Sequence, residues 1–279
     1  MIPPVRIAHR GASGQGLAPE NTLAALELAI EIGVDVLEID VQASRDGQII
    51  VLHDPTLDRT SNGTGPVLDH SLEELRALDA GSWHGADFPG ERVPILEEVL
   101  ELARHRALVL IEIKADFIAE RVLQIIADMK AEEQVIVQAF NPQIVQRVNL
   151  LAPTIPTALL MGKLPATPSR FRARKLVQQV LAVGANALAI WHATLTPPLL
   201  EEMRKRAIGV WCWTVDEEIA MRDLILMGVQ GIITNYPNRL NGVLDDLQRQ
   251  GRLQPPLGRR VRRSRWGRRR QLRKLRLPK

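Results

Sequence analysis

Acidic side chains interrupt two otherwise apolar segments of this 279-residue chain. Residues 36–44 read VLEIDVQAS and carry Glu38 and Asp40 two positions apart, and residues 107–114 read ALVLIEIK and carry Glu112 and Lys114 at the same spacing. Alternate residues of a β-strand share one face, so the aliphatic residues between them occupy the other face. We expect the aliphatic face to pack on helices and the charged side chains to point inward and converge.

Three converging carboxylates, those of Glu38, Asp40 and Glu112, need a compensating positive charge. Two carboxylates about 6 Å apart repel by roughly 3 kcal/mol at an effective dielectric constant near 20, and a divalent cation removes that cost. Oxygen ligands without cysteine favour Mg²⁺ or Ca²⁺ over Zn²⁺, and the sequence does not discriminate between the first two ions. A simpler explanation also fits each pair taken alone, in which a neighbouring Arg or Lys neutralises an inward acid.

Two histidines follow apolar runs, His9 in AHRG and His53 in VLHD. An imidazole takes or gives a proton near neutral pH, as an attacking hydroxyl and a leaving alkoxide require. Arg10 and Lys114, beside a divalent cation, would form a cationic cradle for phosphate. A lone histidine at a strand end is more often structural, and either base could instead neutralise the acids. Together these residues indicate phosphoryl chemistry, and no Ser/His/Asp nucleophile elbow or Walker loop competes with it.

The elements that must position these residues alternate along the chain. Short β-branched runs predict eight strands, at residues 5–10, 36–44, 107–114, 135–140, 155–161, 187–192, 209–215 and 231–234. Segments between them, such as 22–33, 119–130 and 197–207, have the apolar spacing of amphipathic helices. Eight strand–helix units in a single pass favour an α/β fold of the closed TIM (β/α)₈ barrel type over an open doubly wound sheet.

Two details refine this fold. Asn21 or Thr22 is expected to cap the helix over 22–33, which ends at Gly33. Residues 55–94 break the alternation and are too many for a simple connection, so we expect a small insertion after the second strand region, at the barrel mouth. Within it, Asp58, Arg59 and the NGTG turn at 62–65 are expected to serve ordinary loop functions.

Several longer motifs occur in order between His9 and Pro237: AHRG, PENT, EIDVQASRDGQIIVLHDPTLDRTSNGTG, VPILEEVL, IEIK and GVQGIITNYP. In this combination the chain resembles the glycerophosphodiester phosphodiesterase family. The resemblance implies a TIM-barrel hydrolase that cuts glycerophosphodiesters to glycerol phosphate and an alcohol. It also matches residues 55–94 to the family's characteristic insertion.

The resemblance further implies roles for individual residues. The family's catalytic histidines fall on His9 and His53, its metal carboxylates on Glu38, Asp40 and Glu112, and its phosphate contacts on Arg10 and Lys114. One histidine would be the general base and the other the general acid, in an order that the sequence leaves open, with Mg²⁺ or Ca²⁺ as the cofactor. The last strand reads ITNYP where the family commonly has an aspartate, so Asn235 replaces a charge with an amide.

Aromatic residues near the strand ends bear on substrate choice. Phe140 and Trp213 are expected to wall the alcohol side of the substrate pocket, and Trp213 resembles a family pocket aromatic. Trp211, on the same strand face, is expected in the core, whereas Trp191 and His192 could line the mouth. An aromatic wall suits a choline head group and equally a lipid chain, so the head group stays open.

Charge is divided unevenly along the chain, although its net value is only +4. Residues 252–279 carry thirteen of the 36 Lys and Arg residues and no acid, which leaves 23 bases against 32 acids elsewhere. We therefore expect a barrel at 1–250 and a basic, disordered tail at 251–279. The tail could also bind an anionic membrane surface, which suits an enzyme of lipid-derived diesters better than nucleic acid does.

A single cysteine and the lack of a long apolar run predict a cytoplasmic protein, peripheral to a membrane if the tail binds one. Two other functions compete with a glycerophosphodiesterase. A lysophospholipase D would use the same residues on a lysophospholipid and would need a longer apolar pocket. A non-catalytic module that works through its basic tail would be expected to lack some of the histidines and acids, yet all are present. Oligomeric state is not predicted.

Overall fold

A closed barrel of eight parallel strands forms the centre of the structure, a computed structural model that describes residues 1–85, 87–163 and 170–254. In order around the barrel, the strands are β1 (Val5–His9), β2 (Val36–Ala43), β4 (Leu108–Ile113), β5 (Val135–Ala139), β6 (Thr157–Met161), β7 (Ala187–Trp191), β8 (Gly209–Trp213) and β9 (Gly231–Thr234). The barrel closes because β1 pairs in parallel with both β2 and β9. Each strand lies within a range predicted from the sequence, so the TIM barrel is confirmed and the open sheet is wrong.

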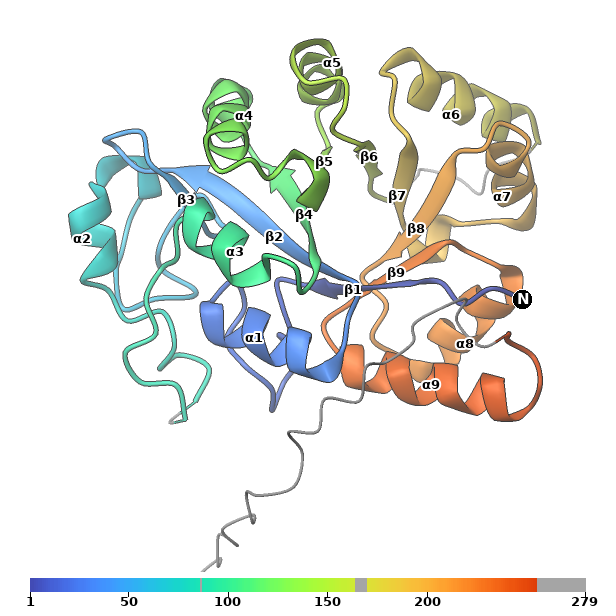
Figure 1. The fold of residues 1–279 in the computed structure, drawn as a ribbon, viewed down its shortest axis with the longest axis horizontal. Helices are drawn as coiled ribbons and strands as arrows, with labels where there is room; N and C mark the ends of the chain where they lie inside the picture. The colour runs from blue at the N-terminus through green and yellow to red at the C-terminus, as the bar shows by residue number, and fades with distance from the viewer. Residues whose placement is uncertain (86, 164–169, 255–279) are drawn as a thin grey trace, which may run out of the picture.

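Helices surround the barrel (Figure 1). They are α1 (Leu23–Ile32), α3 (Leu96–Ala103), α4 (Ala119–Asp128), α5 (Pro142–Leu151), α6 (Arg170–Ala182), α7 (Pro197–Arg204), α8 (Glu218–Met227) and α9 (Pro237–Arg249), with the 3₁₀ segments η2 (Asp116–Ile118), η3 (Glu132–Gln134) and η4 (His192–Thr194) in the connections. The hydroxyl of Thr22 accepts the Ala25 N–H at 3.2 Å, and Gly33, at φ +92°, ends α1. Thr22 is therefore the N-cap, which leaves the Asn21 side chain to bond elsewhere.

Two apolar layers hold the barrel together. The outer layer, between strands and helices, includes the fully buried Leu37 and Ile111. The inner layer fills the barrel interior with Ile7, Val36, Leu110, Leu160, Ala189 and Ile233. Trp211 packs on this inner layer, as predicted, and a Cβ at Gly231 would lie only 2.6 Å from its indole. That position is thereby restricted to glycine.

The insertion begins with a hairpin. The ninth strand, β3 (Ile49–Val51), lies outside the barrel and runs antiparallel to the end of β2, with Val41 opposite Val51. The chain therefore turns back toward the barrel and delivers His53 to its mouth. The segments η1 (Val67–Asp69) and α2 (Leu72–Arg76) follow, around a small core of Ile50, Leu52, Leu57, Val67, Leu75, Ala80 and Val93. The insertion is present as predicted, but β3 is not among the predicted strands.

The end of the described chain packs against the barrel. After α9, Leu253 is buried in the outer apolar layer, and the Gln254 N–H donates to the Met1 carbonyl at 2.8 Å. These first residues of the predicted tail thus lie near the start of β1, and residues from 255 on lie outside the described part. No described helix is both long and apolar enough to cross a membrane.

Candidate active site

The three predicted acids meet inside the barrel at the carboxyl ends of two adjacent strands. Asp40 of β2 lies opposite Glu112 of β4 in the parallel register, and Glu38 precedes Asp40 on the same face. Carboxylate oxygens of the three residues lie within 4.8 Å of one another, and the residues are buried. Glu38 is held on both oxygens, by Gln138 Nε2 at 3.1 Å and by the Arg10 backbone N–H at 3.0 Å.

The two predicted phosphate contacts are ion-paired with these acids. Lys114 Nζ lies 2.7 Å from Asp40 Oδ1 and 2.5 Å from Glu112 Oε1. Arg10 Nε lies 3.1 Å from Asp40 Oδ2, and its Nη1 lies 2.8 Å from Glu20 Oε1. Both cations therefore form ion pairs with the inward acids, which was the alternative explanation from the sequence. These ion pairs also hold Arg10 and Lys114 at the cavity.

Asn21, released from capping α1, completes the surroundings of Asp40. Its Nδ2 donates to Asp40 Oδ2 at 2.9 Å, and its Oδ1 accepts the Asp40 backbone N–H at 3.3 Å. Asn21 has a positive φ of 57°, a conformation that asparagine adopts more readily than most residues. The loop before α1 thus positions the Asp40 side chain and its backbone.

At two of the three acids, the neighbouring positive charges do not offset the effect of burial on the pKa. Burial, together with the charges of Asp40 and Glu112, raises the pKa of Glu38 well above its ordinary value. Burial likewise raises the pKa of Glu112 to about 7. At Asp40 burial acts in the same direction, but the charges of Lys114 and Arg10 prevail and hold its pKa well below the ordinary value. Three clustered carboxylates with this shortfall fit a hard divalent cation.

His9, at the end of β1, is oriented by hydrogen bonds that sequence reasoning missed. Its Nδ1 lies 2.7 Å from Asn235 Oδ1, and Asn235 Nδ2 donates to Asp216 Oδ2 at 2.7 Å. Ser13 Oγ, 3.0 Å from Asn235 Oδ1, also contacts this amide. Burial and the charge of Arg10 lower the pKa of His9 to about 4. The available signal for Asp216 was its place directly after the predicted strand 209–215, where barrel active sites gather.

His53 is oriented by a carboxylate instead. Its Nδ1 lies 2.5 Å from Asp54 Oδ1, and Arg59 Nε donates to Asp54 Oδ2 at 2.6 Å. Arg59 Nη1 reaches Glu20 Oε2 at 2.8 Å, so one ion-pair chain joins His53 to the carboxylate that holds Arg10. The hydrogen bond from Arg59 lowers the pKa of Asp54 to about 2, and burial lowers that of His53.

The expectation of ordinary loop chemistry is therefore wrong for Arg59, because its partners lie beside the catalytic candidates. It holds for the neighbouring Asp58, whose carboxylate accepts the Gly65 N–H at 3.2 Å. A distance of 39 residues separates Arg59 from Glu20 in the sequence, so no local pattern could reveal the pair.

One cavity of about 260 Å³ joins these groups. It is lined by His9, Arg10, Glu38, His53, Glu112, Lys114, Gln138, Phe140, Leu160, Trp213, Thr214 and Ile233. Phe140 and Trp213 form an aromatic wall, in T-shaped contact at 5.6 Å between ring centroids. Trp191 lies outside the lining but 5.9 Å from Trp213, with His192 stacked on it. Among the described residues, Trp213 Nε1 and Gln138 Oε1 are buried without a hydrogen-bond partner.

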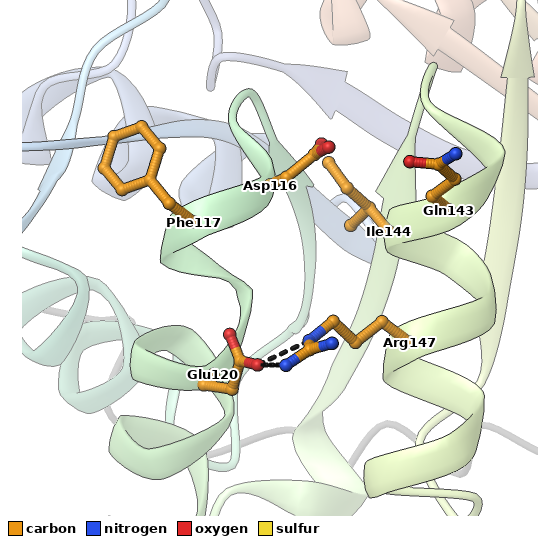
Figure 2. Close-up of a pocket in the computed structure, with 6 residues that line it drawn as sticks. All are labelled: Asp116, Phe117, Glu120, Gln143, Ile144 and Arg147. Atoms are coloured by element: carbon orange, nitrogen blue, oxygen red, sulfur yellow. Dashed lines mark hydrogen bonds and ion pairs between the residues drawn. The ribbon is translucent and has the colours of Figure 1, made fainter.

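A second hollow, of about 370 Å³, lies outside the barrel (Figure 2). It is lined by Asp116, Phe117, Glu120, Gln143, Ile144 and Arg147, from η2, α4 and α5. Glu120 and Arg147 form an ion pair between the two helices. None of the predicted site residues lines this hollow, whereas all of them except Asp40 line the cavity in the barrel.

Comparison with known proteins agrees with this geometry. Residues 9–239 match the model of the Glycerophosphoryl diester phosphodiesterase family. The chain is 41% identical over 236 residues to YhdW of Bacillus subtilis, covering 83% of this chain and 94% of that protein. It is 39% identical over 240 residues to a glycerophosphodiester phosphodiesterase of Caldanaerobacter subterraneus subsp. tengcongensis, covering 84% and 95% of the two chains.

The solved structures give the same answer. A phosphodiesterase of Oleispira antarctica in complex with the product sn-glycerol-3-phosphate superimposes with a TM-score of 0.77 at 28% identity, covering 87% of this chain and 97% of that one. The family match spans most of the sequence, and the two curated relatives are aligned over most of their lengths. The chain therefore belongs to the glycerophosphoryl diester phosphodiesterase family.

Proposed function

We propose that this enzyme hydrolyses small glycerophosphodiesters to glycerol phosphate and an alcohol, with His9 as general base and His53 as general acid. The observation that carries the proposal is the single cavity onto which both imidazoles, the two cations Arg10 and Lys114, and two of the clustered acids open. The relative that holds sn-glycerol-3-phosphate supports glycerol phosphate as the product.

The hydrogen bonds around His9 support its role as base. An ionised carboxylate can only accept, so Asn235 must donate its Nδ2 protons toward Asp216 and present Oδ1 to His9. His9 Nδ1 then carries the proton, and Nε2 keeps its lone pair. A pKa of about 4 keeps this imidazole neutral at physiological pH, ready to accept a proton from a hydroxyl.

The partner of His53 supports the opposite role. Asp54, with a pKa of about 2, is a charged carboxylate against Nδ1 of His53, whereas His9 has only a neutral amide. A carboxylate stabilises an imidazolium more than an amide does. Of the two histidines, His53 is therefore better suited to carry a proton and to deliver it to the leaving oxygen.

Positive charge for the phosphate comes first from this chain's own cations. Arg10 and Lys114 line the cavity, and their ion pairs with acids fix their positions. Glu38, Asp40 and Glu112 would hold a divalent cation, Mg²⁺ or Ca²⁺, which when bound supplies Lewis-acid stabilisation of charge on the phosphate oxygens.

The proton transfers balance over the reaction. His9 Nε2 takes the proton of the attacking hydroxyl while that oxygen bonds to phosphorus, and His53 protonates the alcohol oxygen as its bond to phosphorus breaks. The nucleophile is water or the neighbouring glycerol hydroxyl. In the second case a cyclic phosphate forms, and water opens it in a second step with the two histidines exchanging roles. Either route consumes one water molecule.

The size and lining of the cavity favour a small diester over a lysophospholipid. A volume of about 260 Å³ lies just below the usual range for small-molecule sites, and most of the lining residues are polar or charged. The unpartnered Trp213 N–H and Gln138 Oε1 provide a donor and an acceptor, the pair that a substrate hydroxyl requires.

A hydrolysis panel tests the function. Glycerophosphocholine, glycerophosphoethanolamine and lysophosphatidylcholine are incubated with the enzyme in EDTA and after addition of Mg²⁺ or Ca²⁺. We expect hydrolysis of the two glycerophosphodiesters only with a cation, and slow turnover of the lysolipid. A preference for lysophosphatidylcholine would instead establish a lysophospholipase D, and full activity in EDTA would remove the cation from the proposal.

A further inference from the structure

Exposed aromatic side chains gather on the face of the barrel onto which the catalytic cavity opens. Phe140 follows β5 and Trp191 ends β7, at 48% and 39% exposure. Phe117 lies in η2 after β4, and Phe171 lies in the first turn of α6, at 63% and 79% exposure. All four stand at the carboxyl ends of the adjacent strands β4 to β7, and Phe140 extends the surface into the cavity through its contact with Trp213.

The opposite face of the barrel has a different composition. Its large exposed apolar residues, among those described, are aliphatic: Met1, Ile2, Val5, Leu108, Leu150, Leu151 and Leu181. Tryptophan favours the zone where lipid head groups meet the acyl chains, and phenylalanine is common on the apolar side of surfaces that lie in this zone. The mouth face therefore has the composition of a surface that contacts lipid.

Positive charge surrounds the most exposed ring. Residues 162–182 contain five bases and no acid, namely Lys163, Arg170, Arg172, Arg174 and Lys175. Glu201 and Glu202 lie 3.6 Å from Arg170 and Arg174, but residues 197–207 also carry three bases of their own. The sector formed by α6 and α7 thus keeps a positive charge, which complements an anionic lipid surface.

Charge also sets the limits of this surface. Ile219, at the start of α8, is 77% exposed but follows Glu217 and Glu218, so that sector is unsuited to anionic lipid. Beside Phe117, Glu120 forms an ion pair with Arg147 of α5, whereas Asp116 accepts a hydrogen bond from the neutral Asn141 Nδ2 at 2.7 Å and keeps its charge. Phe117 stands at the edge of the outer hollow drawn in Figure 2.

We propose that this aromatic and basic face docks on an anionic lipid surface, with Phe171 and Phe117 entering the head-group layer. The bases of residues 162–182 contact the anionic head groups. Docking in this orientation turns the catalytic cavity toward the surface from which lipid-derived diesters are released. The proposal stands on exposure and charge, so it holds or fails independently of the hydrolytic mechanism.

Tryptophan quenching by brominated lipids tests the orientation. The full chain with Trp83→Phe and Trp266→Phe, which remove the similarly exposed tryptophan of the insertion and the tryptophan of the basic tail, is mixed with vesicles of phosphatidylcholine and phosphatidylglycerol whose acyl chains carry bromine. We expect quenching that disappears when Trp191→Phe is added, that falls at least threefold with Phe171→Ser, and that vanishes on purely phosphatidylcholine vesicles. Leu150→Ser, an equally exposed site on the opposite face, is the matched control and leaves quenching unchanged.

The basic tail provides the rival outcome. If the protein sediments with anionic vesicles but shows no quenching that depends on Trp191, the tail alone binds and the proposed orientation is wrong. Equal quenching of Phe171→Ser and the control variant contradicts the proposal in the same way, as does the absence of vesicle binding. If an oligonucleotide displaces the protein from the vesicles and Phe171→Ser has no effect on vesicle binding, charge alone drives the binding and the proposed aromatic contact is wrong.

Discussion

The two ends of the barrel interior are built from the same strands but from opposite chemistry. On β2, Val36 belongs to the inner apolar layer, here called the floor, while Glu38 and Asp40 of the acid cluster follow two and four residues later. On β4, Leu110 belongs to the floor and Glu112 to the cluster. Both ends are buried, so burial alone does not distinguish them. The floor stabilises the barrel, whereas the mouth concentrates charge that costs stability and that, in the proposed function, supplies the chemistry.

Removal of the general base is the strongest test that chemistry resides at the mouth. His9→Ala should lower kcat/KM for a glycerophosphodiester by about 10³-fold, because it removes the imidazole proposed to take the proton. The free energy of unfolding should change by less than about 1 kcal/mol, since His9 is not part of the floor. Steady-state kinetics and denaturant unfolding measure the two effects. Unchanged hydrolysis would overturn the assignment.

Neutralising one acid of the cluster should lower the activity and raise the stability of the cation-free protein. Glu112→Gln keeps the shape of the side chain and can still accept from Lys114, but it removes a buried charge, so kcat/KM should fall by roughly 10²-fold while the cation-free protein gains about 1 kcal/mol. Thermal unfolding with EDTA and with Mg²⁺ or Ca²⁺ measures both. The cation should raise the Tm of the unmodified chain but barely that of the variant. If the variant were less stable than the unmodified chain in EDTA, the cluster would not lower the stability of the cation-free protein as proposed.

Truncation of the floor should give the converse result. Leu110→Ala removes a fully buried side chain and should destabilise the protein by about 3 kcal/mol. The kcat of the folded fraction should stay within about twofold, because Leu110 does not line the cavity. Urea unfolding and kinetics below the transition provide the comparison. A large loss of kcat without loss of stability would show that the two ends are not independent.

The smallest expected effect concerns the amide that orients His9. Asn235→Asp places a carboxylate against His9 Nδ1, which favours the imidazolium and raises the pKa of His9. Because the base must be neutral, the acidic limb of the pH profile of kcat/KM should move to higher pH by about one pH unit. Ser13→Ala serves as the control, since it removes a contact to the same amide without adding charge. An unchanged pH profile would show that the side chain at position 235 does not influence the pKa of the general base.

Strand periodicity was sufficient to predict the barrel and the convergence of its acids. Glu38, Asp40 and Glu112 could be placed together because their spacing of two fixes the face, and β2 and β4 are neighbours around the barrel. The positions of His9 and His53 after apolar runs singled out the pair of histidines, to which the resemblance assigned a catalytic role, and the structure brings both to one cavity. The alternatives for Arg10 and Lys114 proved compatible, because each cation both pairs with acids and faces the cavity.

The orienting contacts could not be predicted, because they join loops that are distant in the sequence. Asp216 and Asn235 follow different strands, and the His9 to Asn235 contact spans 226 residues. Arg59 was taken for an ordinary loop residue because its composition context, rich in turn formers, carries no sign of Glu20. Strand β3 was missed since three residues give too short a pattern to separate from a loop.

The hairpin formed by β2 and β3 limits which insertions and deletions this sequence can accept near His53. His53 follows directly from the pairing in which Val41 stands opposite Val51, and a one-residue shift of this pairing would turn the β3 side chains to the opposite face. A change in the length of the turn at 44–48 is therefore tolerable only where this pairing is kept. Leu52, next to His53, also belongs to the small core of the insertion, so changes in that core would reach the imidazole.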